Sequence, residues 1–234
     1  MDLVSMIHQH VDYKNIIITH EISNMKSLSH YKLIATLFKY PGQSFSSDMH
    51  RFLEYMEAKS ETEKTAIKHF VKQAEILNLK EQQEYYLKTF DVGAICYLDI
   101  GYMMFGEDYK RAQLLVNLQN EHTLAGTDCG SELADHLPNV LSLLSTTDNK
   151  DFAEELGFII TLPAVKFMLS KFKSGENYYE HLFEVLLGML ERDFNGEHLQ
   201  EFAMEEERFN GKNEFLIPSP KMAVCNSNCK QKRF

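Results

Sequence analysis

The residues best suited to chemistry lie close together near the middle of the chain. Glu132, Asp135 and His136 fall within five positions and supply two carboxylates and an imidazole. Such groups can act as general acids and bases or bind a metal ion. Neighbouring side chains on a helix point in different directions, however, and Glu132 would have to return from outside the turn. No Ser, Cys or second His accompanies the cluster in a motif. We therefore expect neither catalytic residues nor metal ligands in this cluster.

A structural role for Asp135 is also expected from the residues that follow it. Pro138 is tolerated in the first turn of a helix, and apolar Val140, Leu141 and Leu144 come next at helical spacing. Asp135, or Ser131 before it, would begin this helix. The carboxylate of Asp135 would then accept hydrogen bonds from backbone N–H groups at the positive end of the helix dipole. A cap of this kind is compatible with a binding role for the same cluster.

The four cysteines do not form a disulfide framework in a chain of 234 residues. Cys96 lies in an apolar run and is expected to be buried, whereas Cys129 lies beside a glycine in a loop. Cys225 and Cys229 lie in a basic tail, where cations would favour thiolates and a zinc or redox pair. Two thiols do not complete a zinc site, and no His lies nearby. We favour a tail with two incidental thiols.

Charge and hydropathy limit the classes of partner. The formal net charge is −10, so phosphate backbones would be repelled and we expect no nucleic-acid partner. An acidic surface instead favours basic peptides. No apolar run reaches the roughly 18 residues of a membrane helix, and the N-terminus has no secretory signal pattern. We therefore expect a cytoplasmic protein without membrane insertion.

The elements that must position these residues are all predicted to be helices. Apolar residues recur at helical spacing from Leu28 to Phe38, and Pro41 with Gly42 would end that helix. Ser47 is expected to cap the next helix, and residues 60–63 form a capping box for the one after it. Further helices are predicted around residues 85–90, over 150–173 with a bend at Pro163, over 177–194 and over 197–209. Residues 91–108 are interrupted by glycines and predict an ordered loop or a broken helix.

The most clearly amphipathic helix is predicted over residues 109–125. Gly126 follows it and is a typical helix C-terminal stop. Five of its apolar side chains are expected to face mostly inward, namely Ala112, Leu115, Val116, Leu118 and Leu124. These patterns, without any long period-two alternation, predict an all-α fold. We expect a single globular helical domain of roughly eight to ten helices.

The predicted organisation has three parts. Residues 1–26 form an N-terminal extension, residues 27–210 form the helical domain, and residues 211–234 form a flexible C-terminal tail with the Cys225–Cys229 pair. His8 and His10 fall in the extension, where an exposed polar segment is a better interpretation than a metal site. We expect a monomer or a weak dimer.

Five short motifs follow one another along most of the chain. They are Leu37–Pro41, Tyr86–Asp91, Gly106–Arg111, Glu132–Pro138 and Tyr179–Leu187. Their order resembles the NarJ-type branch of the molybdoenzyme assembly chaperones, the group that also includes the TorD and DmsD proteins. The run Glu-Leu-Ala-Asp-His-Leu-Pro at 132–138 is the most specific of them. Ala134 stands where this family often has Pro, and Ala112 stands where it usually has Gly.

The resemblance implies a chaperone of the TorD/NarJ-like all-α type, and therefore a protein that is not an enzyme. Its client would be the catalytic subunit of a respiratory molybdoenzyme, bound through an N-terminal segment before a molybdopterin guanine dinucleotide cofactor is inserted. The chaperone itself would hold no stable cofactor. The resemblance places seven residues in or behind the client-peptide groove: Phe90, Asp91, Arg111, Glu132, Asp135, His136 and Pro138. Arg111 would equally suit a structural pair with a nearby acid.

The identity of the client stays open at this point. Nitrate reductase is the first expectation, and selenate, chlorate, dimethyl sulfide or hydrocarbon-oxidising molybdoenzymes are alternatives. A second interpretation is an escort for twin-arginine signal peptides of a related exported enzyme, without a part in cofactor loading. A metal-dependent hydrolase and a redox or metal-delivery protein using Cys225 and Cys229 are more distant alternatives.

Overall fold

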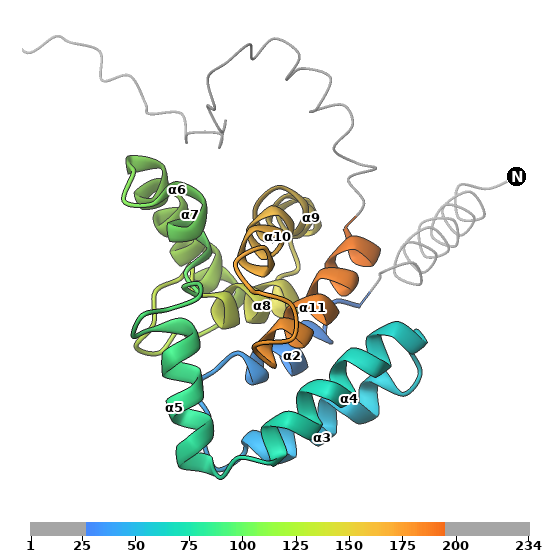
Figure 1. The fold of residues 1–234 in the computed structure, drawn as a ribbon. Coiled ribbons are helices and arrows are strands. Elements are labelled where there is room, and N and C mark those ends of the chain that lie inside the picture. The colour runs from blue at the N-terminus through green and yellow to red at the C-terminus, as the bar shows by residue number, and fades with distance from the viewer. Residues whose placement is uncertain (1–26, 195–234) are drawn as a thin grey trace, which may run out of the picture. The chain divides into compact units, whose positions relative to one another are not determined.

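A computed structural model describes residues 27–194 as a bundle of helices (Figure 1). The helices are α2 (Tyr31–Leu37), α3 (Phe45–Met56), α4 (Glu61–Glu75), α5 (Leu79–Phe90), α6 (Ile100–Phe105), α7 (Tyr109–Ala125), α8 (Leu137–Thr146), α9 (Lys150–Glu155), the π-helix η1 (Leu156–Thr161), α10 (Leu162–Leu169) and α11 (Tyr179–Asp193). Because α9, η1 and α10 are continuous, the described residues form nine helical segments. The predicted all-α fold of eight to ten helices is confirmed.

Several predictions fall on residues outside the described range. These are the extension at 1–26, the helix at 197–209, the boundary at 210 and the Cys225–Cys229 tail. The chain divides into two units, residues 1–195 and 196–234, and the described residues all belong to the first. Among the described helices, none has both the length and the apolar character needed to cross a membrane.

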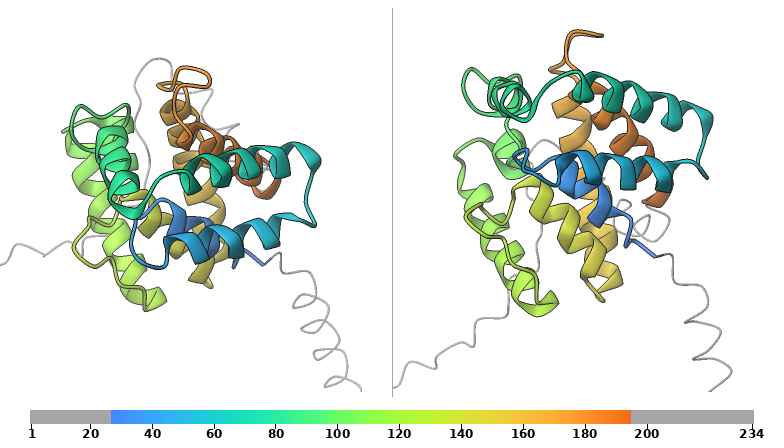
Figure 2. Two further views of the ribbon diagram at one scale, coloured as in Figure 1. Left: turned by 60° about the horizontal axis from the view of Figure 1, so that its bottom comes forward. Right: turned by 90° about the horizontal axis from the view of Figure 1, so that it is seen from below.

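Helix α11 is the centre of the hydrophobic core. It packs against α4 and α10, while α2 packs against α8 and α3. Figure 2 shows α3 and α4 as an antiparallel pair beside this centre. Aromatic rings fill the space around α11: Tyr179 lies 4.7 Å from Phe90, and Phe183 lies 4.9 Å from Phe38, between ring centroids. The rings of Tyr179 and Phe90 meet edge to face, an arrangement that adds attraction to their buried area.

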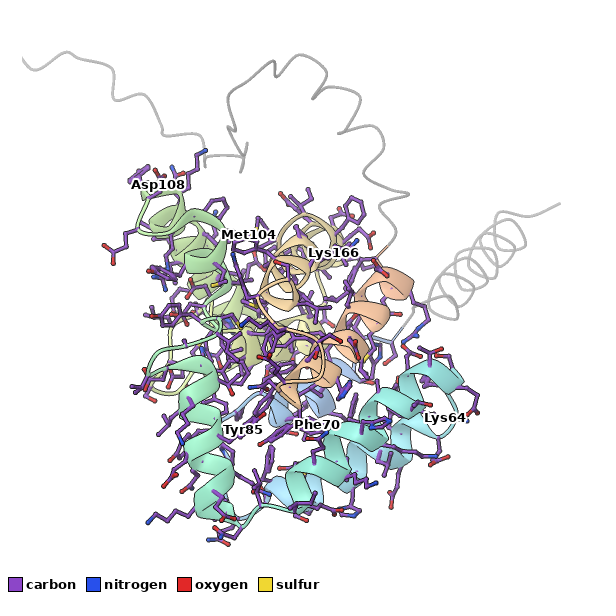
Figure 3. The ribbon with its side chains drawn as sticks, in the orientation of Figure 1. Lys64, Phe70, Tyr85, Met104, Asp108 and Lys166 are labelled. Carbon is purple, nitrogen blue, oxygen red and sulfur yellow. The ribbon has the colours of Figure 1, made fainter. Side chains whose placement is uncertain are left out.

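The same aromatic cluster joins α4 and α5 to the core. Phe70 of α4 and Tyr85 of α5 are labelled in Figure 3, and both meet Tyr178 just before α11. The ring of Tyr85 stacks on that of Tyr178 with centroids 4.2 Å apart, and its hydroxyl accepts a hydrogen bond from the Tyr178 backbone N–H (3.3 Å). The C-terminal end of α5, which carries Phe90, is therefore fixed to the rigid core.

Side chains cap the starts of α4, α5, α7 and α9, with two corrections to the sequence analysis. Ser60 is the N-cap of α4, as predicted, but its hydroxyl both accepts from the Glu63 backbone N–H and donates to the Glu63 carboxylate. The reciprocal capping box occurs instead at α5, between Asn78 and Glu81. Ser47 does not cap α3, because that helix already begins at Phe45 and the Ser47 hydroxyl donates to the carbonyl of Ser44.

The predicted bend at Pro163 takes the form of a π-helical turn. Residues 156–161 widen into η1 immediately before Pro163, which lies in the first turn of α10. A proline inside a helix lacks the N–H that the preceding turn would use, and a wider turn accommodates this loss. The hydroxyl of Thr161 donates to the carbonyl of Leu156 (2.8 Å) within the widened turn. The α-helix ends at Leu169, before the predicted limit of 173.

Helix α7 has the predicted bounds, and Leu118 is buried as predicted, but three of the five side chains expected to face inward do not. Gly126 ends it in the left-handed conformation, with φ of 65°. The buried residues are Leu114, Leu118 and His122, whereas Ala112, Val116 and Leu124 are exposed. The expectation for these three exposed residues was therefore wrong. Arg111 lies on the buried stripe, so a long-range ion pair of this residue sets the orientation of α7, as described below.

Capping gives a direct test of the fold. Replacing Asn78 by Ala removes the side-chain acceptor for the Glu81 N–H, which is one half of the capping box. We expect the free energy of unfolding, measured by urea titration, to fall by about 1 kcal/mol. Ser47→Ala is the control and should change it by less than about 0.5 kcal/mol. Equal losses in the two variants would contradict the assignment of the N-caps.

Candidate functional site

A buried ion pair joins the two segments that carry the predicted site residues. Asp135 is 0% exposed, and its carboxylate accepts hydrogen bonds from Nε (2.9 Å) and Nη2 (3.5 Å) of Arg111. The same Nη2 donates to Oδ2 of Asp99 (3.1 Å). The second oxygen of Asp99, Oδ1, lies 3.1 Å from Nδ1 of His136. One guanidinium thus holds two carboxylates, and one of these carboxylates also meets an imidazole.

Backbone hydrogen bonds lock the same two loops together. The Ile100 N–H donates to the Asp135 carbonyl, and the Leu137 N–H donates to the Leu98 carbonyl, each at 2.9 Å. They form an isolated antiparallel bridge between Asp99 and His136. The starts of α6 and α8 are therefore fixed to each other, and Arg111 of α7 closes the arrangement from the side.

The expected capping role of Asp135 is wrong. Helix α8 begins at Leu137 with His136 at the N-cap, and no side chain caps it. Asp135 lies one residue too early to reach the free N–H groups of the first turn, and its carboxylate bonds Arg111 instead. The alternative interpretation of Arg111, a structural pair with a nearby acid, is the one that the structure bears out. Pro138 lies in the first turn of α8, as predicted.

The pKa shifts in this network follow from burial and pairing. Burial raises the pKa of Asp135, and the hydrogen bond and positive charge of Arg111 oppose that rise. Partial burial alone would lower the pKa of Arg111, but its hydrogen bonds and attraction to Asp135 and Asp99 outweigh burial and raise it. The hydrogen bond from His136, aided by Arg111, lowers the pKa of Asp99. A permanently charged guanidinium is therefore the centre of the network.

Gly101 leaves the room that the buried carboxylate needs. A Cβ atom at this position of α6 would lie 2.6 Å from Oδ2 of Asp135 and 3.2 Å from Cγ of Arg111. The neighbouring Tyr102 lies under the guanidinium, with Cζ of Arg111 5.3 Å from the ring centroid. Helix α6 lies in the segment predicted as an ordered loop or a broken helix. It can approach the ion pair closely because residue 101 has no side chain.

A cavity of about 800 Å³ opens beside this network, and we call it the groove. Its wall comes from the segment after α2, the end of α5, the loop before α6 and the loop between α7 and α8. The lining residues are Lys39, Tyr40, Tyr86, Leu87, Phe90, Asp91, Tyr97, Leu98, Asp99, Asp128, Cys129, Gly130, Ser131, Glu132, His136, Pro138 and Asn139. A volume of this size suits several side chains of a bound segment.

Five of the seven predicted site residues line the groove, and two lie behind it. Phe90, Asp91, Glu132, His136 and Pro138 meet there although they come from separate segments. Phe90 is buried against Tyr86 and Tyr179, so it supports the groove from below. Asp91 and Glu132 are exposed. Asp135 and Arg111 do not line the groove, because they are engaged with each other in the network behind it.

The sequence analysis missed part of the groove. Tyr40 and Tyr86 were inside quoted motifs but were not selected; their rings meet edge to face with centroids 5.6 Å apart. Tyr97 and Asp99 lie in the irregular segment before α6, where helical periodicity gives no signal. Asn139 lies on α8, and its side-chain amide donates to the carbonyls of Leu133 (2.9 Å) and Cys129 (3.2 Å). It thereby shapes the loop that forms one wall.

The groove combines exposed aromatic surface with negative charge. Its lining includes the carboxylates of Asp91, Asp99, Asp128 and Glu132, against a single lysine, Lys39. The rings of Tyr40 and Tyr97 are exposed beside them. Such a lining suits a ligand that carries both apolar and cationic groups.

Metal binding is not supported within residues 27–194. No group of three or more His, Cys, Asp or Glu side chains there is arranged to hold a metal ion. Cys96 is buried, which raises the pKa of its thiol to about 12, and burial also raises the pKa of Cys129. Neither thiol is therefore activated as a nucleophile at neutral pH.

Comparison of the chain with models of known protein families and with curated proteins finds no match. The grounds for proposing a function are therefore the geometry and charge of the groove, together with the resemblance of the motifs.

The effect of Gly101→Ala on the free energy of unfolding tests the position of the Asp135 carboxylate. Replacing a helical glycine by alanine ordinarily stabilises a protein by about 1 kcal/mol. At Gly101 the new methyl group would instead displace the Asp135 carboxylate, so we expect a loss of about 1–3 kcal/mol in the free energy of unfolding. Gly42→Ala lies outside the helices and its methyl group meets no atom within 4 Å, so it is the control for an added methyl group without a clash. A Gly101→Ala variant more stable than the wild type would contradict the position of the buried carboxylate.

The ion pair itself can be tested by removing its negative charge. Asp135→Asn keeps the size of the side chain but leaves Arg111 with Asp99 alone. We expect the free energy of unfolding to fall by about 3 kcal/mol, near the lower end for removing one partner of a buried pair. The exposed Asp148→Asn is the control and should cost less than about 0.5 kcal/mol. An equally small cost at Asp135 would show that the pair does not hold the loops together.

Proposed function

We propose that this protein is a cytoplasmic chaperone that binds an N-terminal segment of the catalytic subunit of a respiratory molybdoenzyme, with nitrate reductase as the first expectation. The observation that carries the proposal is the groove. Phe90, Asp91, Glu132, His136 and Pro138, selected from motifs that resemble those of NarJ-type chaperones, converge on one cavity.

The chemistry of the groove supports binding rather than catalysis. Asp135 is buried and bonded to Arg111, and His136 lies beside Asp99, so these side chains are held in a structural network. The exposed groups are carboxylates and tyrosine rings. Aromatic rings offer apolar contact with little loss of conformational entropy, and carboxylates attract basic side chains. The groove therefore fits an extended or helical segment with apolar residues and at least one Lys or Arg.

In this mechanism the chaperone performs no reaction. The apolar side chains of the client segment lie against Tyr40 and Tyr97, while its basic side chains meet the acidic rim. Binding keeps the apolar segment from water and holds the subunit open until the molybdopterin guanine dinucleotide cofactor has been inserted. The folded client then no longer offers the segment, and the complex separates.

Binding can be tested with a synthetic peptide covering the N-terminal segment of the nitrate reductase catalytic subunit from the same genome. The double variant Asp91→Asn/Glu132→Gln removes two exposed groove carboxylates. We expect about a tenfold loss of affinity, chiefly through slower association, together with a weaker dependence on salt. Fluorescence anisotropy and stopped-flow measurements at low and high salt would give both quantities.

The matched control for this experiment is the double variant Glu54→Gln/Glu176→Gln. It changes the net charge equally, and both residues are exposed and outside the groove lining. It should bind the peptide nearly as well as the wild type. Equal affinity for the groove variant and the wild type, or equal losses in both variants, would contradict the proposal. A twin-arginine leader bound in place of the nitrate reductase segment would identify an exported client.

A further inference from the structure

The outward face of α7 is unusual among the exposed helix faces of this acidic chain. We define the α7 face as the eight exposed residues of that helix: Tyr109, Ala112, Gln113, Val116, Gln119, Asn120, Thr123 and Leu124. At 3.6 residues per turn they cover one continuous side, roughly 140° of the helix circumference. None of them is charged. The exposed faces of α3, α4 and α5, by contrast, carry charged residues such as Glu54, Lys68 and Glu84.

Three apolar side chains of this face are mostly exposed. Tyr109 is 74% exposed, Val116 is 62% exposed and Leu124 is 80% exposed. The orientation is imposed by Arg111, since the guanidinium must reach Asp135 on the opposite side of the helix. Both views in Figure 2 place α7 at the edge of the described helices. Large apolar side chains gathered on one open face indicate a contact surface.

We propose that the α7 face is an interface between two copies of this chain, paired through antiparallel α7 helices about a two-fold axis beside Val116. In that register Tyr109 lies opposite Leu124 of the second copy, and Gln113 lies opposite its Asn120. An apolar contact and an amide pair are then each formed twice, as a self-complementary two-fold interface requires. The small Ala112 lets the two helices approach closely.

Charge is the reason to choose a second copy over another partner. The chain carries a net charge of −10, so two copies repel each other wherever acidic surfaces meet. The α7 face is a surface on which two copies can touch without opposing carboxylates. It also offers no charge by which a charged peptide would be selected. The groove, by contrast, is lined by four carboxylates.

The size of the face indicates a weak dimer. The 17 residues of α7 span about 25 Å. A single pair of helices of this length buries on the order of 600 Å² in total, well under half of a standard interface. The dimer should therefore form and dissociate with protein concentration. No residue of the α7 face lines the groove, so dimerisation leaves the proposed client site open.

Sedimentation velocity of the full chain from about 1 µM to about 500 µM tests the proposal. The wild type should shift from monomer toward dimer as concentration rises. Val116→Glu and Val116→Lys should each remain monomeric at the highest concentration. An equimolar mixture of the two should dimerise again, because opposite charges then meet beside the two-fold axis. Ile76→Glu, an equally drastic change at a side chain that is 76% exposed at the C-cap of α4, should behave as the wild type.

The results that would overturn the proposal are equally specific. They are a wild type that stays monomeric throughout, a Val116→Glu variant that dimerises normally, or a mixture of the Glu and Lys variants that stays monomeric. Thermal unfolding would confirm that each variant folds, and Leu124→Glu provides a second disrupting variant at an 80% exposed position. Peptide binding in the groove should survive Val116→Glu, so failure of the dimer and failure of the chaperone proposal can be told apart.

Discussion

The buried pair of Asp135 and Arg111 is the interaction on which the functional part of this fold depends. A carboxylate without access to water is costly to ionise unless a permanent positive charge meets it. Arg111 supplies that charge and also holds Asp99, which in turn meets His136. Residues from α7, from the loop before α6 and from the loop before α8 are thereby brought to one place, and the backbone bridge between Asp99 and His136 fixes their distance.

Two surfaces with opposite properties follow from this one constraint. On one side, the fixed loops support a groove lined by Asp91, Glu132 and exposed tyrosines, which suits a basic and apolar segment. On the other side, α7 turns an uncharged face with Val116 and Leu124 to solvent, because its opposite side must carry Arg111. Carboxylates line the groove, where a client is expected, and are absent from the α7 face, where two copies of the chain are proposed to meet.

The comparison of sequence with structure shows which signals are local. The bounds of α7 were predicted correctly because Gly126 and the apolar periodicity are local features. Its orientation was predicted wrongly, since apolar residues occur on both sides and the choice is made by a partner 24 positions away. The motifs selected residues such as Glu132 and His136, and both of these line the groove. They gave no indication of Tyr97 or Asp99, which lie in an irregular segment placed only by tertiary contacts.

The central claim, that the groove holds a molybdoenzyme subunit, is tested most directly by affinity capture. The tagged full chain would be isolated from its own cells during anaerobic growth on nitrate, and the bound proteins identified by mass spectrometry. We expect one large molybdoenzyme catalytic subunit, retained by Glu54→Gln/Glu176→Gln and depleted in Asp91→Asn/Glu132→Gln. A chain recovered without such a subunit, or with equal amounts of it on both variants, would contradict the account.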